Sequence, residues 1–345
     1  MGGFARVPTN PWKDIALLRP GPRNLLTDVP GLTVGNATDE AVRSGVTVVR
    51  FPGGWGAGVD VRGGGPGVRE TETLSPENGY ARLHGLTLSG GSVFGLGAAD
   101  GVVAALSQAG EGFPVSPGAP RAPIVAGAVL YDLGNGGDKD WGLEPPYRRL
   151  GQEALAAADA TFALGAVGAG RGARAGLVPG GLGSASLDLG DGLIVGALAA
   201  VNPVGSVFMP DGETFWAWPF EIDGEFGGRI PTGPAGAVEP MPDDSRLAGQ
   251  GRLTQGANTT LAVVAVNAAL TAAECKRLAM MAQDGLSRAV RPAHTPFDGD
   301  VVFAVASGAV DLGETGRLRH IARLGSAAGD CLARAIARGV YAARG

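Results

Sequence analysis

The residues best suited to chemistry are Asn258, Thr259 and Thr260, which directly precede an apolar run from Leu261 to Val266. The run is apolar on both faces, so it predicts a central, buried strand that begins near Thr259. A hydroxyl there can attack the carbonyl carbon of the preceding peptide bond, and an N→O acyl shift then gives an ester that water hydrolyses. The freed Thr259 would carry an α-amine with a pKa of roughly 8, which can act as the base for its own hydroxyl.

The same three residues allow two other interpretations. A threonine at the beginning of a strand is common for its β-propensity alone. Asn258-Thr259-Thr260 is also an N-glycosylation sequon. Glycosylation is the less favoured interpretation, because the N-terminus lacks the charged segment and long apolar run of a signal peptide.

A second group of interest is Asp298-Gly299-Asp300, which leads into the apolar run Val301 to Ala306. Two carboxylates this close can orient an ammonium group or share a proton. A solvated Asp-Gly turn is the simpler alternative. The pair offers only two carboxylate ligands, and the His and Cys residues are scattered, so we expect neither a metal nor a cofactor.

Two further polar residues lie at predicted strand ends. Asn202 follows the apolar run Leu193 to Val201 and precedes Pro203. An amide there can donate a hydrogen bond to a developing oxyanion, although an Asn that caps a turn before Pro is the more usual interpretation of this pattern. Tyr131 follows another strand candidate and is a candidate substrate-binding residue for the same pocket, with a place in the core or rim as the alternative.

Composition excludes several function classes. The net charge is −5 and only three lysines occur, so nothing suggests nucleic acid or an anionic membrane as a partner. No apolar stretch reaches the ~20 residues that span a bilayer. Two cysteines favour a reduced compartment, and we expect a cytoplasmic protein. The glycine-rich segment 165–172 lacks the signature of a phosphate loop, and no Gly-x-Ser-x-Gly elbow occurs.

Strands and helices alternate along the chain, which predicts an α/β fold of one domain, residues 1–345. Residues 1–28 are interpreted as an extended arm, and residues 239–257 as a flexible surface linker before Thr259. Thr271 and Glu274 fit a capping box that begins a helix ending near Val290. Other predicted strands are 32–34, 46–49, 124–130 and 163–167, and other helices are 92–106, 148–158 and much of 317–343.

Several motifs together carry a resemblance that covers nearly the whole chain. They are Arg62-Gly63-Gly64-Gly65-Pro66-Gly67, Ser89-Gly90-Gly91-Ser92, Gly168-Ala169-Gly170, Asn202-Pro203-Val204-Gly205, Asn258-Thr259-Thr260 and Asp298-Gly299-Asp300. With them the chain resembles the self-processing family of L-aminopeptidase/D-esterase, β-peptidyl aminopeptidase and nylon-oligomer hydrolase. The resemblance implies a four-layer α-β-β-α sandwich of the N-terminal-nucleophile type. It also implies cleavage into a long chain, 1–258, and a short chain, 259–345.

The resemblance assigns roles to individual residues. Thr259 matches the nucleophile, Asn202 matches an Asn proposed to stabilise the oxyanion, and Asp298 with Asp300 matches the acidic pair of the nylon hydrolase. One departure concerns a Lys of the nylon hydrolase, for which the best match here is Leu177, with Arg174 nearby. Either another group assists processing, or the substrate preference differs.

The resemblance further implies a peptide or amide as substrate and assembly of the processed units into a homo-oligomer, with a tetramer favoured. Two alternatives stay open. One is an acyltransferase like ornithine acetyltransferase, which shares the fold and passes the acyl group to an amine. The other is a homologue that keeps the fold but is neither cleaved nor an enzyme.

Overall fold

A single hydrogen-bonded sheet forms the centre of the structure, a computed structural model that describes residues 17–233, 238–248 and 258–345. Within these ranges its strands lie in the order β3-β5-β4-β2-β11-β10-β9-β8, and β1 pairs with β2. The strands are β1 (Thr33–Asp39), β2 (Ser44–Val61), β3 (Gly67–Arg69), β4 (Arg82–Ser89), β5 (Val125–Val129), β8 (Gly181–Asp188), β9 (Ile194–Asn202), β10 (Thr259–Ala268) and β11 (Val301–Val310). A separate pair joins β6 (Arg174–Ala175) to β7 (Val178–Pro179).

The long strand β2 belongs to both halves of the sheet. Its first part pairs with β1 and β4, and its last part pairs with β11. The register with β4 shifts between Arg50 and Trp55, where Gly53 and Gly54 have φ of 74° and 80°. Residues with a side chain rarely adopt such angles, so the two glycines let the strand change direction here.

The two halves of the sheet pack against each other across a shared core. Leu86 of β4 and Ala126 of β5 belong to the same buried cluster as Leu198 of β9 and Val263 of β10. Side chains alternate between the faces of a strand, so Ala197 and Ala199 of β9 belong instead to the cluster that contains the C-terminal helices. The continuous sheet is therefore folded into two layers.

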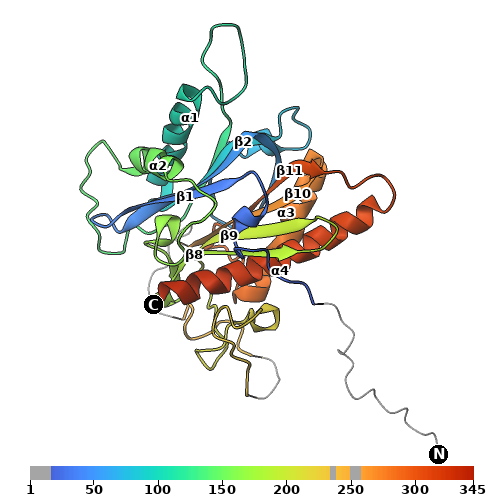
Figure 1. The fold of residues 1–345 in the computed structure, drawn as a ribbon. Helices are drawn as coiled ribbons and strands as arrows, with labels where there is room; N and C mark the ends of the chain where they lie inside the picture. Colours follow the sequence, from blue (N-terminus) through green and yellow to red (C-terminus); the bar gives the residue numbers. More distant parts are fainter. Residues whose placement is uncertain (1–16, 234–237, 249–257) are drawn as a thin grey trace, which may run out of the picture.

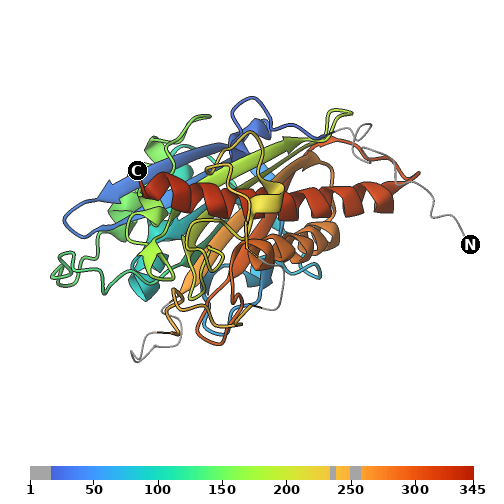
Figure 2. The ribbon, with the colours of Figure 1, turned by 90° about the horizontal axis from the view of Figure 1, so that it is seen from below.

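Helices cover both outer faces of these layers (Figures 1 and 2). On one side, α1 (Ala98–Gln108) and α2 (Tyr147–Ala156) share a buried cluster with residues of β1 and β2. On the other side, α3 (Ala272–Ala289) and α4 (Arg317–Ala343) pack on β8 to β11. The predicted four-layer α-β-β-α sandwich is confirmed, with one buried cluster at each of its interfaces.

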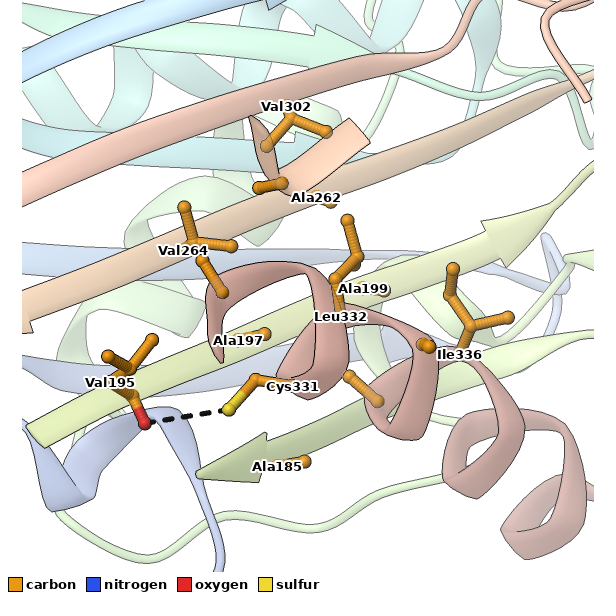
Figure 3. Packing of buried hydrophobic residues seen from close by; sticks show 14 of the residues in the cluster. Ala185, Val195, Ala197, Ala199, Ala262, Val264, Val302, Cys331, Leu332 and Ile336 are labelled. Carbon is orange, nitrogen blue, oxygen red and sulfur yellow. Dashed lines mark hydrogen bonds between the residues drawn. The ribbon is translucent and has the colours of Figure 1, made fainter. Parts of the chain in front are cut away.

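Small residues bring α4 close to the sheet (Figure 3). Leu332 and Ile336 pack over Ala197 and Ala199, and the Cys331 thiol lies 3.7 Å from the carbonyl oxygen of Val195. A Cβ atom at Gly183 of β8 would lie 1.9 Å from the Ala335 carbonyl oxygen, so only glycine permits this approach. Both cysteines are free and buried.

Helix boundaries follow the sequence closely where capping signals exist. Thr271 is the N-cap of α3: its hydroxyl accepts from the Glu274 amide at 3.2 Å, and its own amide donates to the Glu274 carboxylate at 2.8 Å. The predicted capping box is therefore confirmed, and α4 occupies the predicted 317–343. Within the described ranges, the structure contains no helix that is both long enough and apolar enough to cross a bilayer.

Two local predictions were wrong. Residues 163–167 form no strand, only a bridge between Gly165 and Leu182, because Gly165 takes φ of 88° and the chain turns into a 3-10 helix, Gly168–Gly170. The helix predicted for 92–106 is α-helical only from Ala98, since Ser92 has φ of 53° and residues Ser92–Gly97 form a 3-10 segment that precedes α1.

The two predicted irregular segments are described only in part. Of the arm 1–28, residues 1–16 lie outside the described residues, while Arg19 bridges Asp188 and Leu26–Asp28 form a buried 3-10 helix. Of the linker 239–257, residues 249–257 lie outside them. Residues 239–248 form neither helix nor strand, yet Ser245 is fully buried.

Candidate active site

The ends of three neighbouring strands bring the predicted site residues together. Thr259 begins β10 opposite Asn202, the last residue of β9, in antiparallel register. On the other side of β10, Asn258 forms a parallel bridge with Asp298, just before β11. Five of the six predicted residues, Asn202, Asn258, Thr259, Asp298 and Asp300, are at most 1% exposed.

Two donors converge on the carbonyl oxygen of Asn258. The Thr259 hydroxyl donates to it at 2.5 Å, and the backbone N–H of Gly299 donates to it at 2.7 Å. A Cβ atom at Gly299 would lie 2.6 Å from the Thr259 hydroxyl oxygen, so glycine is required here. Donors aimed at a carbonyl oxygen stabilise the negative charge that forms there when a nucleophile attacks its carbon.

Asp298 holds two segments of backbone beside the Asn258–Thr259 bond. One carboxylate oxygen accepts from the Val204 amide at 3.0 Å. The other accepts from the amide and hydroxyl of Thr295 at 3.0 and 2.6 Å. Burial, together with the neighbouring charge of Asp300, raises the pKa of Asp298 to about 6, while its three donors favour the charged form.

Asp300 contacts the residue after the candidate nucleophile. It accepts from the Thr260 amide at 2.8 Å and, with its other oxygen, from the His294 amide at 3.0 Å. The Nδ1 atom of His294 lies 3.0 Å from the same oxygen. His294, to which the sequence assigned no role in the site, therefore belongs to the surroundings of the site, whereas His84 and His320 make no contact with it among the described residues.

A glycine-rich loop lies directly on Asp298-Gly299-Asp300. The amides of Gly65 and Gly63 donate to the carbonyl oxygens of Asp298 and Asp300 at 2.8 and 3.2 Å. A Cβ atom at Gly63 would lie 2.2 Å from the Asp300 amide nitrogen. The loop that the sequence marked as a family motif thus fixes the peptide carrying the Gly299 donor.

Arg246 is the functional candidate that the sequence did not reveal. Its guanidinium donates to the side-chain oxygens of Asn258 and Asn202 at 2.5 and 2.9 Å. It also donates to the carbonyl oxygens of Arg174 and Gly176 at 2.5 and 3.2 Å. Burial, with a smaller contribution from the charge of Arg174, lowers the pKa of Arg246 to about 10, so it stays charged at neutral pH. Its segment has no periodicity, so no sequence signal marks it.

Leu177 and Arg174 lie at or near the position that matches the Lys of the nylon hydrolase. Neither of their side chains provides the positive charge beside Asn258. Leu177 is 52% exposed. The Arg174 side chain donates to the Leu177 carbonyl oxygen at 2.9 Å, and it is the Arg174 backbone that contacts Arg246. The cation beside Asn258 is therefore Arg246, which lies 72 residues after Arg174 and 12 residues before Asn258 in the sequence.

A small pocket opens beside Asn202. Its volume is about 130 Å³, and its lining includes Tyr131, Asn202, Arg174 and Arg246. The side-chain amide nitrogen of Asn202 donates to the Tyr131 carbonyl oxygen at 3.4 Å, and Tyr131 is 37% exposed. Among the described residues, no cluster of His, Cys, Asp and Glu could hold a metal ion.

Comparisons with known proteins indicate a family for this chain. The model of peptidase family S58 matches residues 24–345. An uncharacterized aminopeptidase of Mycobacterium tuberculosis is 42% identical over 337 residues, covering 93% of this chain and 94% of that protein. A 6-aminohexanoate-oligomer endohydrolase of Kocuria sp. is 31% identical over 305 residues, covering 86% and 78%.

Solved structures share the fold. A β-aminopeptidase of Burkholderia sp. superposes with a TM-score of 0.68 at 26% identity, over 94% of this chain and 88% of that one. The L-aminopeptidase D-Ala-esterase/amidase of Ochrobactrum anthropi, described as a variant of the Ntn-hydrolase fold, gives 0.65 at 19% identity over 95% and 89%. The family model, the curated relatives and the fold agree: this chain belongs to peptidase family S58 and is a hydrolase of the peptidase class.

Proposed function

We propose that this protein cleaves its own Asn258–Thr259 peptide bond and then hydrolyses amides with Thr259 as an N-terminal nucleophile. The observation that carries the proposal is the pair of contacts on the Asn258 carbonyl oxygen, from the Thr259 hydroxyl at 2.5 Å and the Gly299 amide at 2.7 Å. Nucleophile and oxyanion donor already flank the bond that must break.

In the cleavage step, the Thr259 hydroxyl oxygen attacks the carbonyl carbon of Asn258 and gives up its proton, which is transferred to the leaving Thr259 nitrogen. The resulting oxyanion accepts from the Gly299 amide, which needs no rearrangement because it already donates to the same oxygen. The C–N bond then breaks, and the nitrogen with this proton becomes the α-amine of Thr259. Water hydrolyses the remaining ester, which releases Asn258 as a carboxylate.

In the hydrolytic cycle, the new α-amine accepts the hydroxyl proton of Thr259 while the oxygen attacks the substrate carbonyl. The substrate C–N bond then breaks, the leaving amine takes up that proton, and water hydrolyses the ester on Thr259 to release the acid and restore the hydroxyl. Asn202 is the proposed oxyanion donor of this cycle. Its side-chain oxygen is occupied by Arg246 and by the Arg174 amide at 3.0 Å, which directs its NH₂ group toward the pocket at Tyr131. Tyr131 is the proposed contact for the bound substrate.

The acidic pair has a positioning role in this proposal. The contacts of Asp298 and Asp300 come from Val204, Thr260, His294 and Thr295, which are groups of the protein itself. These contacts support a pair that holds the nucleophile and the Gly299 amide in place, rather than one that binds a substrate ammonium group.

The substrate is proposed to be a small peptide, an amino-acid amide or an oligomer of an ω-amino acid. The names of the two curated relatives, an aminopeptidase and a 6-aminohexanoate-oligomer endohydrolase, support this range. Assembly of the processed units into a tetramer and a cytoplasmic location remain predictions. Sedimentation of the purified protein and fractionation of its host cells measure them.

Mass spectrometry of the purified protein tests the self-cleavage. We expect two polypeptides, residues 1–258 and residues 259–345, that separate on a denaturing gel and co-purify under native conditions. Hydrolysis is then measured with p-nitroanilides of α- and β-amino acids and with linear 6-aminohexanoate oligomers. A single uncleaved polypeptide in folded protein contradicts the proposal.

A further inference from the structure

Arg246 connects the two asparagines that flank the Thr259 reaction centre. Its Nη1 atom donates to the Asn258 side-chain oxygen at 2.5 Å, and its Nη2 atom donates to that of Asn202 at 2.9 Å. The two asparagines have different parts in the proposed chemistry: Asn258 supplies the carbonyl that is attacked, whereas Asn202 pairs with Thr259 across the strands and lines the pocket.

The guanidinium decides which way both amides point. Arginine carries five N–H donors and no acceptor, so only the oxygen of an Asn side chain can face it. The NH₂ group of Asn202 is thereby turned to the Tyr131 carbonyl oxygen. The NH₂ group of Asn258 is turned away from the cation and has no partner among the described residues.

Arg246 is itself held in place by hydrogen bonds of its backbone and of its side chain. Its backbone amide donates to the Val204 carbonyl oxygen at 2.9 Å, and its side chain reaches the carbonyl oxygens of Arg174 and Gly176. Val204 in turn donates to Asp298 at 3.0 Å. A chain of hydrogen bonds therefore links Arg246 to the loop that carries the Gly299 amide.

We propose that Arg246 is a positioning residue for self-cleavage, which fixes Asn258 so that its carbonyl group stays between the Thr259 hydroxyl and the Gly299 amide. This inference rests on the proposed function and names a residue that the proposed chemistry does not itself require.

The test is the rate of self-cleavage in freshly made protein. Wild type, Arg246→Met and Arg246→Lys are synthesised in a cell-free system, and the ratio of uncleaved chain to the two fragments is followed on denaturing gels. We expect Arg246→Met to be cleaved about 100-fold more slowly, because small misplacements of a reacting group cost rates of this order. Arg246→Lys, a single-point donor that cannot hold both amides, should be slowed less.

Chemical rescue separates positioning from general damage to the fold. Guanidinium ion at low, non-denaturing concentration should accelerate cleavage of Arg246→Met and leave wild type unchanged, since it can occupy the vacated donor site. Arg229→Met is the matched control, because Arg229 is exposed and pairs only with Glu213 among the described residues. It should be cleaved at the wild-type rate.

The outcomes distinguish the two proposals. Cleavage of Arg246→Met or Arg246→Lys at the wild-type rate overturns the role of Arg246 and leaves self-cleavage intact. Slow cleavage that guanidinium does not rescue, together with a melting temperature well below that of wild type, also overturns it, because the loss is then structural. If Arg246→Met does not fold, the rate of Arg246→Lys decides. An uncleaved wild type removes the proposed function itself.

Discussion

The backbone amide of Gly299 donates to the carbonyl oxygen of Asn258 at 2.7 Å, from the middle of the Asp298-Gly299-Asp300 segment. The two carboxylates that flank this glycine hold its peptide through contacts with Val204, Thr260, His294 and Thr295. The acidic pair is therefore linked to the Asn258–Thr259 bond through the amide that lies between its two members.

Replacing Thr259 by Ala should abolish both self-cleavage and hydrolysis, because the proposed nucleophile is lost. Thr259→Ser keeps a hydroxyl and should still yield fragments 1–258 and 259–345. Intact mass and turnover of a p-nitroanilide measure the two effects. Wild-type turnover by purified Thr259→Ala would refute the assignment of the nucleophile.

Gly299→Ala should block self-cleavage in a protein that still folds. The added methyl group would lie 2.6 Å from the Thr259 hydroxyl oxygen and 2.8 Å from the Gly65 carbonyl oxygen, so the donor peptide must shift. We expect a loss of about 100-fold or more in cleavage rate. Gly97→Ala is the control, since its Cβ would meet no atom within 4 Å. Equal cleavage rates for the two variants contradict the role of the Gly299 amide.

Asp300→Asn should slow self-cleavage and turnover together. The neutral amide loses the charge that accepts from Thr260 and His294, and its NH₂ group cannot accept from either. Hydrogen bonds to a charged group contribute about 1.5–3 kcal/mol, so a lower melting temperature should accompany the loss. Asp311→Asn, at an exposed position beyond β11, is the control. Unchanged rates in Asp300→Asn would make the pair a structural turn only.

The pH dependence of self-cleavage should report Asp298. Its pKa is raised to about 6, so the carboxylate that holds Val204 and Thr295 is lost as pH falls through 6 rather than near its ordinary value of 3.8. We therefore expect cleavage to be fast above pH 6 and to slow below it. Rapid mixing of newly made precursor into buffers from pH 5 to pH 8 measures this, and an unchanged rate at pH 5 contradicts it.

Hydrolysis by the processed protein should show an additional transition that self-cleavage lacks. The α-amine of Thr259 exists only after cleavage, and it must be neutral to accept a proton, so turnover should rise as pH increases through roughly 8. Identical pH profiles for the two reactions would argue against the amine as the base.

Thr271→Ala should destabilise the fold without affecting the chemistry. It removes the N-cap of α3, whose hydroxyl accepts from the Glu274 amide, and such losses cost about 1 kcal/mol. Thermal unfolding measures the cost, and cleavage kinetics should match wild type. A large change in cleavage rate would mean that α3 influences the site directly.

Local patterns in the sequence predicted the elements that carry the site. The doubly apolar run after Thr259, the similar run after Asp300 and the capping box at Thr271 each depend on neighbours along the chain, and each element was found where expected. The resemblance to the self-processing family added the layer architecture, which periodicity alone does not determine.

What the sequence could not supply depends on long-range packing or on the backbone. Arg246 reaches Asn202 and Asn258 from a segment without periodicity, and His294 reaches Asp300 through a turn. Gly299 contributes an N–H group, which every non-proline residue has, so its residue type gave no indication of a donor. The glycines that bend β2 are similarly indistinct among 60 glycines.

The strand order has a consequence for the protein after cleavage between Asn258 and Thr259. Strands β10 and β11 pair with each other and are inserted between β2 and β9, so the smaller fragment would supply the middle of the sheet rather than an edge. Removing the smaller fragment would leave unpaired backbone groups along one edge of β2 and one edge of β9 in the larger fragment. It would also leave the outer edges of β10 and β11 unpaired in the smaller one. The two polypeptides should thus denature as one cooperative body, and once parted they should not recombine readily.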